Sequence, residues 1–272
     1  KKITREFYLS RGFSSIPSRG ALSALTVAGA PSGWELALQI SAKIGGSLPL
    51  DRLLEGAIHY AGVGVPVTRS LQKNVVNKSN ELTDVPGFSE TFLPDGKPPI
   101  VGERFVLPAL AETLMQIGDR GISDFYEGEL SRKIISDLAK VGSPLSLEDM
   151  EKHKAQTTEP LQVATSSGTL YNMPPPTQGI ASLIILSLFD ILKRPEAETA
   201  DYIHAMIEAT KAAFDIRDKY VADPDYMNVL VTKFLSHDSL TQLASGIDFS
   251  HAKPWNTQVD SGDTVWMGAA DS

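Results

Sequence analysis

One stretch of the chain is almost entirely apolar, and it limits the folds that the sequence can adopt. It runs from Ile180 to Leu192 and follows the proline-rich segment Met173–Gly179. A helix that is apolar on all sides is stable only when other elements cover it. Thr177 precedes this stretch, where a threonine hydroxyl can cap the first N–H groups of a helix. The sequence therefore predicts a helix over 180–192 that is buried between layers of other structure.

The segments around this helix predict both strands and helices. Strands are expected over 161–164 and 169–173, joined by the turn Ser166–Gly168 into a hairpin, and over 21–27. Residues 70–100 are polar and rich in Pro and Gly, which predicts surface turns such as Phe92–Pro98. Apolar periodicity and glycine stops predict helices over 4–12, 33–44, 50–61, 107–118, 127–141, from 147 to before Pro160, 199–220 and 234–243, with Ser236 as the cap of the last.

The helix expected over 199–220 is the longest of the set. We expect its apolar face to be formed by Tyr202, Ile203, Met206, Ile207, Ala213 and Phe214. The glycine-rich run Gly62–Pro66 lacks the Lys-Ser/Thr pair and the spacing of a phosphate loop, so a turn that ends a helix is the better prediction.

The composition excludes several classes of function. A chain of 272 residues with 42% hydrophobic and 21% charged residues is long enough to bury a sizeable core. A net charge of −8 and a pI of about 5.2 argue against nucleic acid and anionic membranes as partners. No apolar run reaches the roughly 18 residues of a membrane-spanning helix. Cysteine is absent, which excludes thiol catalysis, disulfides and cysteine-ligated zinc.

Three other groups of polar residues suggest chemistry only weakly. The histidines occur singly and without metal-ligand spacing, so no metal site is expected: His59, His153, His204, His237 and His251. Four aspartates after the long helix lack the spacing of a calcium loop and fit a solvated helix end: Asp215, Asp218, Asp223 and Asp225. Glu127 and Glu129 could form a carboxylate pair for glycoside hydrolysis, but favourable placement at a helix start explains them more simply.

Thr264 stands where a polar, turn-rich segment meets a run of small and apolar residues that ends at Ser272. If the Asp263–Thr264 bond were cut, the hydroxyl of Thr264 would lie beside its own free α-amine. An α-amine titrates near pH ~8 and can act as the base that makes the hydroxyl nucleophilic. The alternative is an ordinary threonine at the start of a strand, since threonine favours strands.

An ordered set of segments resembles the γ-glutamyltranspeptidase family, from about Phe7 to the end of the chain. No single segment is decisive, but their order along the chain is specific. The segments are Phe92–Gly96, Gly102–Arg104, Leu110–Leu114, Gly121–Glu129, Met173–Ile180, Ala213–Tyr220, Asp223–Asp225 and Asp263–Thr264.

This resemblance implies an α+β fold of the N-terminal nucleophile hydrolase type, the four-layer αββα sandwich, of which this chain is expected to hold an incomplete part. It implies a precursor that cuts itself at Asp263–Thr264 and uses Thr264 as nucleophile, with no metal or organic cofactor. Residues 1–263 are then the large-subunit portion of one domain, with its N-terminal part missing, and residues 264–272 begin the small subunit. Substrate-binding residues stay unidentified, since the family's carboxylate-binding arginine is expected before Lys1 and its oxyanion residues after Ser272.

The sequence departs from the family directly after the nucleophile. Typical members have a second threonine and a histidine there, whereas this chain has Val265 and Trp266. In this it is closer to the oxamate amidohydrolase-like branch of the family. We therefore expect an amide hydrolase or acyl transferase that acts on a small carboxylate-bearing amide, γ-glutamyl or oxamate-like. A catalytically silent homologue that serves as a binding module is the alternative.

The expected partners are the small-molecule amide and the protein's own small subunit, and a homo-oligomer is left open. The expected location is the cytoplasm or the periplasm, with the cytoplasm preferred.

Overall fold

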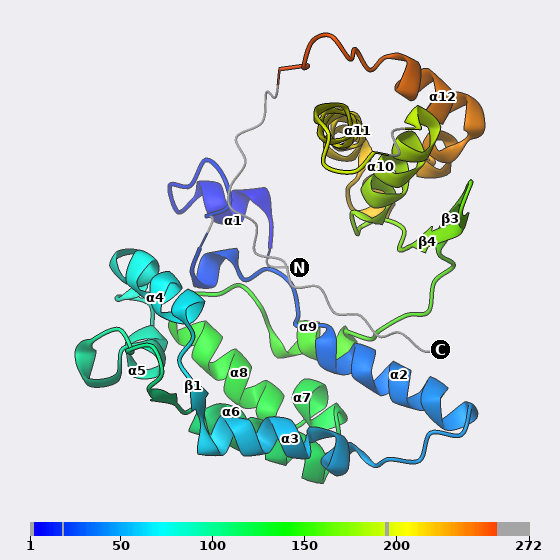
Figure 1. The fold of residues 1–272 in the computed structure, drawn as a ribbon. Helices are drawn as coiled ribbons and strands as arrows, with labels where there is room; N and C mark the ends of the chain where they lie inside the picture. The colour runs from blue at the N-terminus through cyan, green and yellow to red at the C-terminus, as the bar shows by residue number, and fades with distance from the viewer. Residues whose placement is uncertain (1–2, 18, 194–195, 255–272) are drawn as a thin grey trace. The chain divides into compact units, whose positions relative to one another are not determined.

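The computed structural model describes residues 3–17, 19–193 and 196–254 (Figure 1). The chain divides into two compact units, Lys1–Gln156 and Thr157–Ser272. Each unit has its own hydrophobic core.

The first unit is built mainly from helices and contains one short antiparallel ladder. In this ladder β1 (Val65–Pro66) pairs with β2 (Arg104–Phe105), Val65 opposite Phe105 and Pro66 opposite Arg104. The other elements are α1 (Arg5–Leu9), η1 (Ala21–Ser23), α2 (Ala30–Lys43), α3 (Leu50–Val63), α4 (Arg69–Leu82), α5 (Phe88–Phe92), η2 (Pro94–Gly96), α6 (Pro108–Arg120), α7 (Ser123–Glu127), α8 (Glu129–Lys140) and α9 (Leu147–Lys152), where η denotes a 3₁₀ helix.

The core of the first unit lies where α6, α7, α8 and α9 meet. Its buried side chains are Ile117, Ile122, Tyr126, Leu130 and Met150. Helix α3 packs along α6 and lies beside it in Figure 1. The helices predicted over 107–118 and 127–141 are present as α6 and α8, and both contribute side chains to this core.

The second unit is organised around α10 (Gly179–Leu192), which contacts most of its other helices and strands, although Leu186 is 50% exposed. Ile180, Leu183, Ile184 and Leu188 of this helix are at most 1% exposed. The predicted buried helix is thus confirmed. The elements around it are β3 (Leu161–Thr165), β4 (Gly168–Asn172), α11 (Ala200–Tyr220), η3 (Pro224–Tyr226), η4 (Val231–Leu235) and α12 (His237–Ser245).

The predicted hairpin is also confirmed. β3 and β4 pair antiparallel, with Leu161 opposite Asn172 and Thr165 opposite Gly168. Leu161 and Val163 alternate with exposed residues along β3 and face the core that α10 supplies.

The predicted apolar face of the long helix is wrong for three of its six residues, whereas Ala213 is fully buried and Phe214 packs against the core as expected. Ile203, Met206 and Ile207 are 40%, 41% and 44% exposed among the residues described. The fully buried line of α11 consists of alanines: the predicted Ala213, and Ala205 and Ala209, which were not predicted. Ala209 and Ala213 belong to the core around α10. Small side chains let two helix backbones approach closely, so packing against the bulky side chains of α10 selected alanine rather than the largest apolar residues.

The strand predicted over 21–27 is wrong. Residues 21–23 form the 3₁₀ turn η1, and no ladder includes any part of this segment. Its backbone makes local bonds, such as Ser23 N–H to Gly20 C=O at 3.0 Å, and the Tyr8 hydroxyl donates to Leu22 C=O at 2.8 Å. Gly20, with φ of 87°, turns the chain before the segment can extend.

Within the polar region 70–100, the structure contains α4, a helix that was not predicted from the sequence. The Thr68 hydroxyl caps it by accepting a hydrogen bond from Leu71 N–H at 3.1 Å. Of its 14 residues only Val75 is buried, and most of the others are polar. Its composition therefore hid the apolar periodicity by which helices are found in a sequence.

Candidate functional site

The two residues of the predicted processing bond, Asp263 and Thr264, lie outside the described residues. So do Val265 and Trp266. The structure describes the chain up to Pro254, so the nearest described part is the segment between α12 and that residue.

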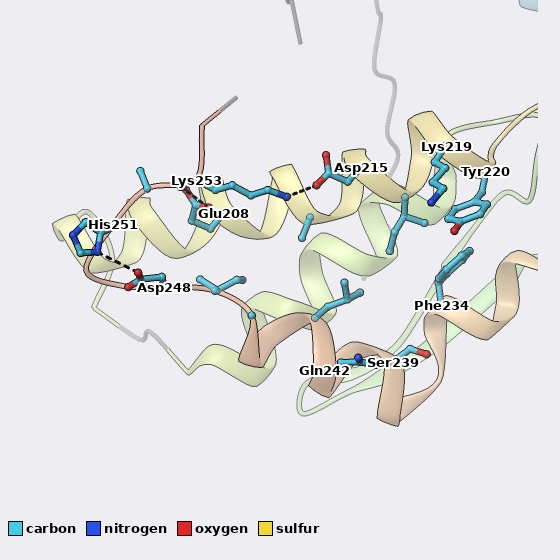
Figure 2. Close-up of a pocket in the computed structure, with 16 residues that line it drawn as sticks. Glu208, Asp215, Lys219, Tyr220, Phe234, Ser239, Gln242, Asp248, His251 and Lys253 are labelled. Carbon is cyan, nitrogen blue, oxygen red and sulfur yellow. Dashed lines mark hydrogen bonds and ion pairs between the residues drawn. The ribbon is translucent and has the colours of Figure 1, made fainter. Parts of the chain in front are cut away.

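This segment forms one wall of a groove of about 840 Å³ in the second unit (Figure 2). Helices α11 and α12 form the other walls. The polar side chains that line the groove include Glu208, Asp215, Lys219, Gln242, His251 and Lys253. The groove therefore contains both acidic and basic side chains, and one of its walls is the segment that precedes the predicted processing bond in the sequence.

Glu208 is a buried carboxylate, only 5% exposed, at the middle of α11. Lys211 donates to it from one turn farther along the helix, with Nζ 2.6 Å from Oε1. The backbone N–H of Lys253 lies 3.3 Å from each carboxylate oxygen. A buried charge persists when it is paired and hydrogen-bonded, and here both conditions are met.

Asp248 begins the segment and holds its own turn. Its carboxylate accepts the backbone N–H of Ser250 at 2.7 Å, and His251 Nδ1 lies 3.2 Å from its other oxygen. The hydrogen bond from Ser250, with a smaller contribution from His251, lowers the pKa of Asp248 below its ordinary value although burial opposes this. These hydrogen bonds thus favour the charged form of the Asp248 carboxylate at the start of the turn.

Lys253 also forms an ion pair with Asp215, which Figure 2 shows alongside α11. Both side chains are more than 60% exposed. An exposed pair is screened by water and contributes little to stability. The position of Lys253 therefore depends more on its backbone contacts than on its charged end.

The structure brings together two of the segments that carry the family resemblance. Arg217, within Ala213–Tyr220, donates from Nη1 to Gln178 Oε1 at 3.1 Å, and Gln178 belongs to Met173–Ile180. The guanidinium of Arg217 also lies over the Phe214 ring, 3.6 Å from its centroid. The turn before α10 is thereby tied to α11.

Thr177 acts near the start of α10 but is not its N-cap, which is Gln178. The Thr177 hydroxyl accepts from Gly179 N–H at 3.3 Å and lies within 3.0 Å of the carbonyl oxygens of Met173 and Pro174. The Thr177 hydroxyl thus forms hydrogen bonds within the Met173–Gly179 turn, whereas the sequence predicted only that it would cap the helix.

The other polar residues singled out from the sequence have structural roles where they are described. Asp218 pairs with Arg217, and the Asp223 carboxylate accepts Asp225 N–H at 3.0 Å. Glu129 forms ion pairs with Lys133 and Arg120, which lower its pKa to about 2. Within the described ranges, no group of three or more His, Asp or Glu side chains could hold a metal ion.

The histidines lie on separate elements of the two units. His59 contacts Tyr60 in α3, His153 stacks on Tyr126 with ring centroids 5.4 Å apart, and His237 begins α12. Among the contacts between described residues, His204 and His251 share a partner, Asp248.

Solved structures with this arrangement define the class of protein. Cephalosporin acylase from Bacillus halodurans matches with a TM-score of 0.80 and 32% identity, over 90% of this chain and 46% of that one. γ-Glutamyltranspeptidase from Pseudomonas nitroreducens matches with a TM-score of 0.77 and 28% identity, over 91% of this chain and 74% of that one. The fold is therefore a helix-rich, incomplete part of the α+β fold of N-terminal nucleophile hydrolases, as the sequence predicted.

The family model for γ-glutamyltranspeptidase matches residues 1–272. The oxamate amidohydrolase proenzyme of Klebsiella pneumoniae is 44% identical over 262 residues, which cover 96% of this chain and 50% of the relative. A glutathione hydrolase-like YwrD proenzyme of Bacillus subtilis is 32% identical, over 100% of this chain and 51% of the relative. The chain belongs to the γ-glutamyltranspeptidase family, whose relatives named here are hydrolases, and it spans about half the length of these two relatives.

Across residues 3–17, 19–193 and 196–254, no helix combines the length and the apolar composition needed to cross a membrane.

Proposed function

We propose that this chain is part of a self-processing amidohydrolase, with residues 1–263 in the large subunit and Thr264 as the first residue of the small one. The observation that carries this is the 44% identity to the oxamate amidohydrolase proenzyme over 96% of the chain. A proenzyme is cut to become active, and the polar-to-apolar junction at Asp263–Thr264 suits such a cut. Because the relatives are enzymes by name, we prefer this function to that of a silent binding module.

In the proposed reaction the Thr264 hydroxyl attacks the carbonyl carbon of a small amide. The α-amine of Thr264 takes the hydroxyl proton and delivers it to the departing amine, which leaves an ester between substrate and enzyme. Water, activated by the same amine, then hydrolyses this ester and releases the acid. Both steps use groups of a single residue, so the proposed mechanism requires no metal or organic cofactor.

We propose an acyl group that carries a carboxylate, such as an oxamate-like or γ-glutamyl group. Support comes from the name of the 44% identical relative and from Val265 and Trp266, which replace the usual Thr-His pair. On this basis hydrolysis exceeds transfer to a peptide amine. Transfer of γ-glutamyl to glycylglycine that is faster than hydrolysis would contradict the choice of substrate class. We place the protein in the cytoplasm in preference to the periplasm.

The proposal is tested with the full-length protein, purified and followed on a denaturing gel without added protease. We expect two bands, and N-terminal sequencing of the smaller one should begin Thr-Val-Trp. The Thr264→Ala variant should stay a single chain and hydrolyse no amide, whereas Thr264→Ser should retain some processing because serine supplies both a hydroxyl and an α-amine. Splitting of Thr264→Ala at the same bond would overturn self-processing.

A further inference from the structure

One face of α11 contacts the segment that follows α12. His204, Glu208 and Lys211 stand at positions i, i+4 and i+7, which lie on the same side of a helix. We name these three residues the α11 strip. Each of them contacts residues 248–253, at sequence separations of 42 to 45 residues.

The strip holds the segment by its backbone at both ends. At the start, His204 Nε2 lies 2.9 Å from the Asp248 carbonyl oxygen and donates to it, because a carbonyl oxygen can only accept. At the end, Glu208 accepts the N–H of Lys253, and Lys211 Nζ donates to the Lys253 carbonyl oxygen at 2.5 Å. Both peptide groups that flank the Lys253 side chain are therefore fixed to α11.

The burial of the Glu208–Lys211 pair indicates that this hold is more than a surface contact. The side chains are 5% and 11% exposed, whereas the other ion pairs described on α11 are more open to solvent. A buried ion pair rarely adds net stability, because removing its charges from water costs about as much as the pair returns. Its retention here suggests a positional role, and the backbone of Lys253 is what it positions.

We propose that the α11 strip sets the point from which the chain runs toward the Asp263–Thr264 bond, so that the strip is a positioning device for self-processing. This rests on the proposed function of Thr264. Lys253 is the last residue that the strip holds, and it stands ten positions before Asp263 in the sequence.

The experiment uses the full-length proenzyme and the double variant Glu208→Leu/Lys211→Met. This variant removes both charges and the acceptor of the Lys253 N–H, and it leaves no charge buried alone. The matched control is Lys253→Ala, which loses the ion pair with Asp215 but keeps the backbone contacts of residue 253. We expect processing of the double variant to be slower by about twofold or more, the effect of losing one backbone hydrogen bond, and that of Lys253→Ala to be unchanged. Equal processing rates in the parent and the double variant overturn the proposal.

Hydrogen exchange tests the hold directly and independently of processing. In a Thr264→Ala background, the double variant should exchange the Lys253 amide about tenfold faster, while amides of α10 keep the parental rate. Faster exchange in α10 as well would mean that the double variant has lost its fold. In that case Glu208→Asp is used instead, because it keeps the charge but its shorter side chain reaches less far toward Lys253. Unchanged exchange at Lys253 in Glu208→Asp and in the double variant refutes the strip.

The two proposals fail in different ways. If the parent protein and Thr264→Ala behave alike on the gel, the proposed function is wrong, and the positioning role falls with it even when exchange confirms the contact. If Thr264→Ala blocks splitting but the double variant splits at the parental rate, self-processing stands and the positioning role alone is wrong.

Discussion

A β-carbon placed on Gly179 would lie 2.2 Å from the carbonyl oxygen of Met173. The turn Met173–Gly179 therefore closes onto the first residue of α10 with no room for a side chain. The same turn is tied to α11 through Gln178 and Arg217. This tight closure gives a physical reason for a glycine at the end of the proline-rich motif.

We predict that Gly179→Ala destabilises the protein by about 1–3 kcal/mol, because a backbone oxygen must move to admit the methyl group. Urea unfolding of the variant and the parent measures this. Gly56→Ala is the control: Gly56 lies inside α3, and a β-carbon added there would meet nothing within 4 Å, so alanine should be neutral or stabilising by up to about 1 kcal/mol. Equal stability of the parent and Gly179→Ala would show that the turn relaxes freely.

Tyr126→Phe should cost about 1–3 kcal/mol of unfolding free energy, since it leaves a buried N–H without its acceptor. The Tyr126 hydroxyl accepts from Ser32 N–H at 3.0 Å and donates to Ala28 C=O at 2.7 Å. Denaturant titration compares this variant with the control Tyr60→Phe. Tyr60 is 61% exposed, so its replacement should change the unfolding free energy by no more than about 0.5 kcal/mol. A loss no larger than that of the control would mean that water replaces the hydroxyl.

Asp124 should give the protein a stability that depends on pH. Burial raises the pKa of Asp124, but hydrogen bonds from Glu129 N–H and Gln116 Nε2, at 3.0 and 2.7 Å, outweigh burial and lower it. Because the folded pKa lies below the unfolded one, this stability is complete above the unfolded value of about 3.9. It is lost as the pH falls through the folded pKa.

Asp124→Asn should therefore be less stable than the parent by about 1–3 kcal/mol at pH 7, with the difference shrinking below about pH 4. Unfolding free energies measured from about pH 7 to about pH 2.5 test this. Asp137→Asn is the control, since Asp137 is 75% exposed and pairs with a similarly exposed Lys140. A difference that stays constant over this whole range would contradict the assigned role of the carboxylate charge.

The proposed base predicts the pH dependence of the reaction. A free α-amine has a pKa of about 7.7–8.0, so kcat/KM should rise with pH as this one group loses its proton. Single replacements of the histidines should leave that acidic limb in place, including His204 and His251, which contact Asp248. Rate profiles of processed variants provide the measurement. Loss of turnover in one correctly processed histidine variant would eliminate the α-amine as the sufficient base.

Several features could be predicted from the sequence because they depend on local order along the chain. The apolar run 180–192 required a buried helix, the β3–β4 hairpin followed from alternation and a short turn, and Ser236 caps α12 as expected, accepting Ser239 N–H at 3.3 Å. The family resemblance likewise depended on the order of short motifs, and the family match over residues 1–272 confirms it. Thr264 as nucleophile stays a prediction.

Other features depended on which elements meet, and the sequence alone could not determine them. Periodicity found Ala213 but otherwise pointed to large apolar residues of α11 that are exposed, because close packing on α10 favours Ala209 over Ile203. The contact of Glu208 with Lys253 joins residues 45 positions apart, and no pattern within either segment encodes it. The sequence by itself determined the local elements and the family; tertiary structure decided which faces are buried and which charges hold distant backbone, because both depend on neighbours brought together only by folding.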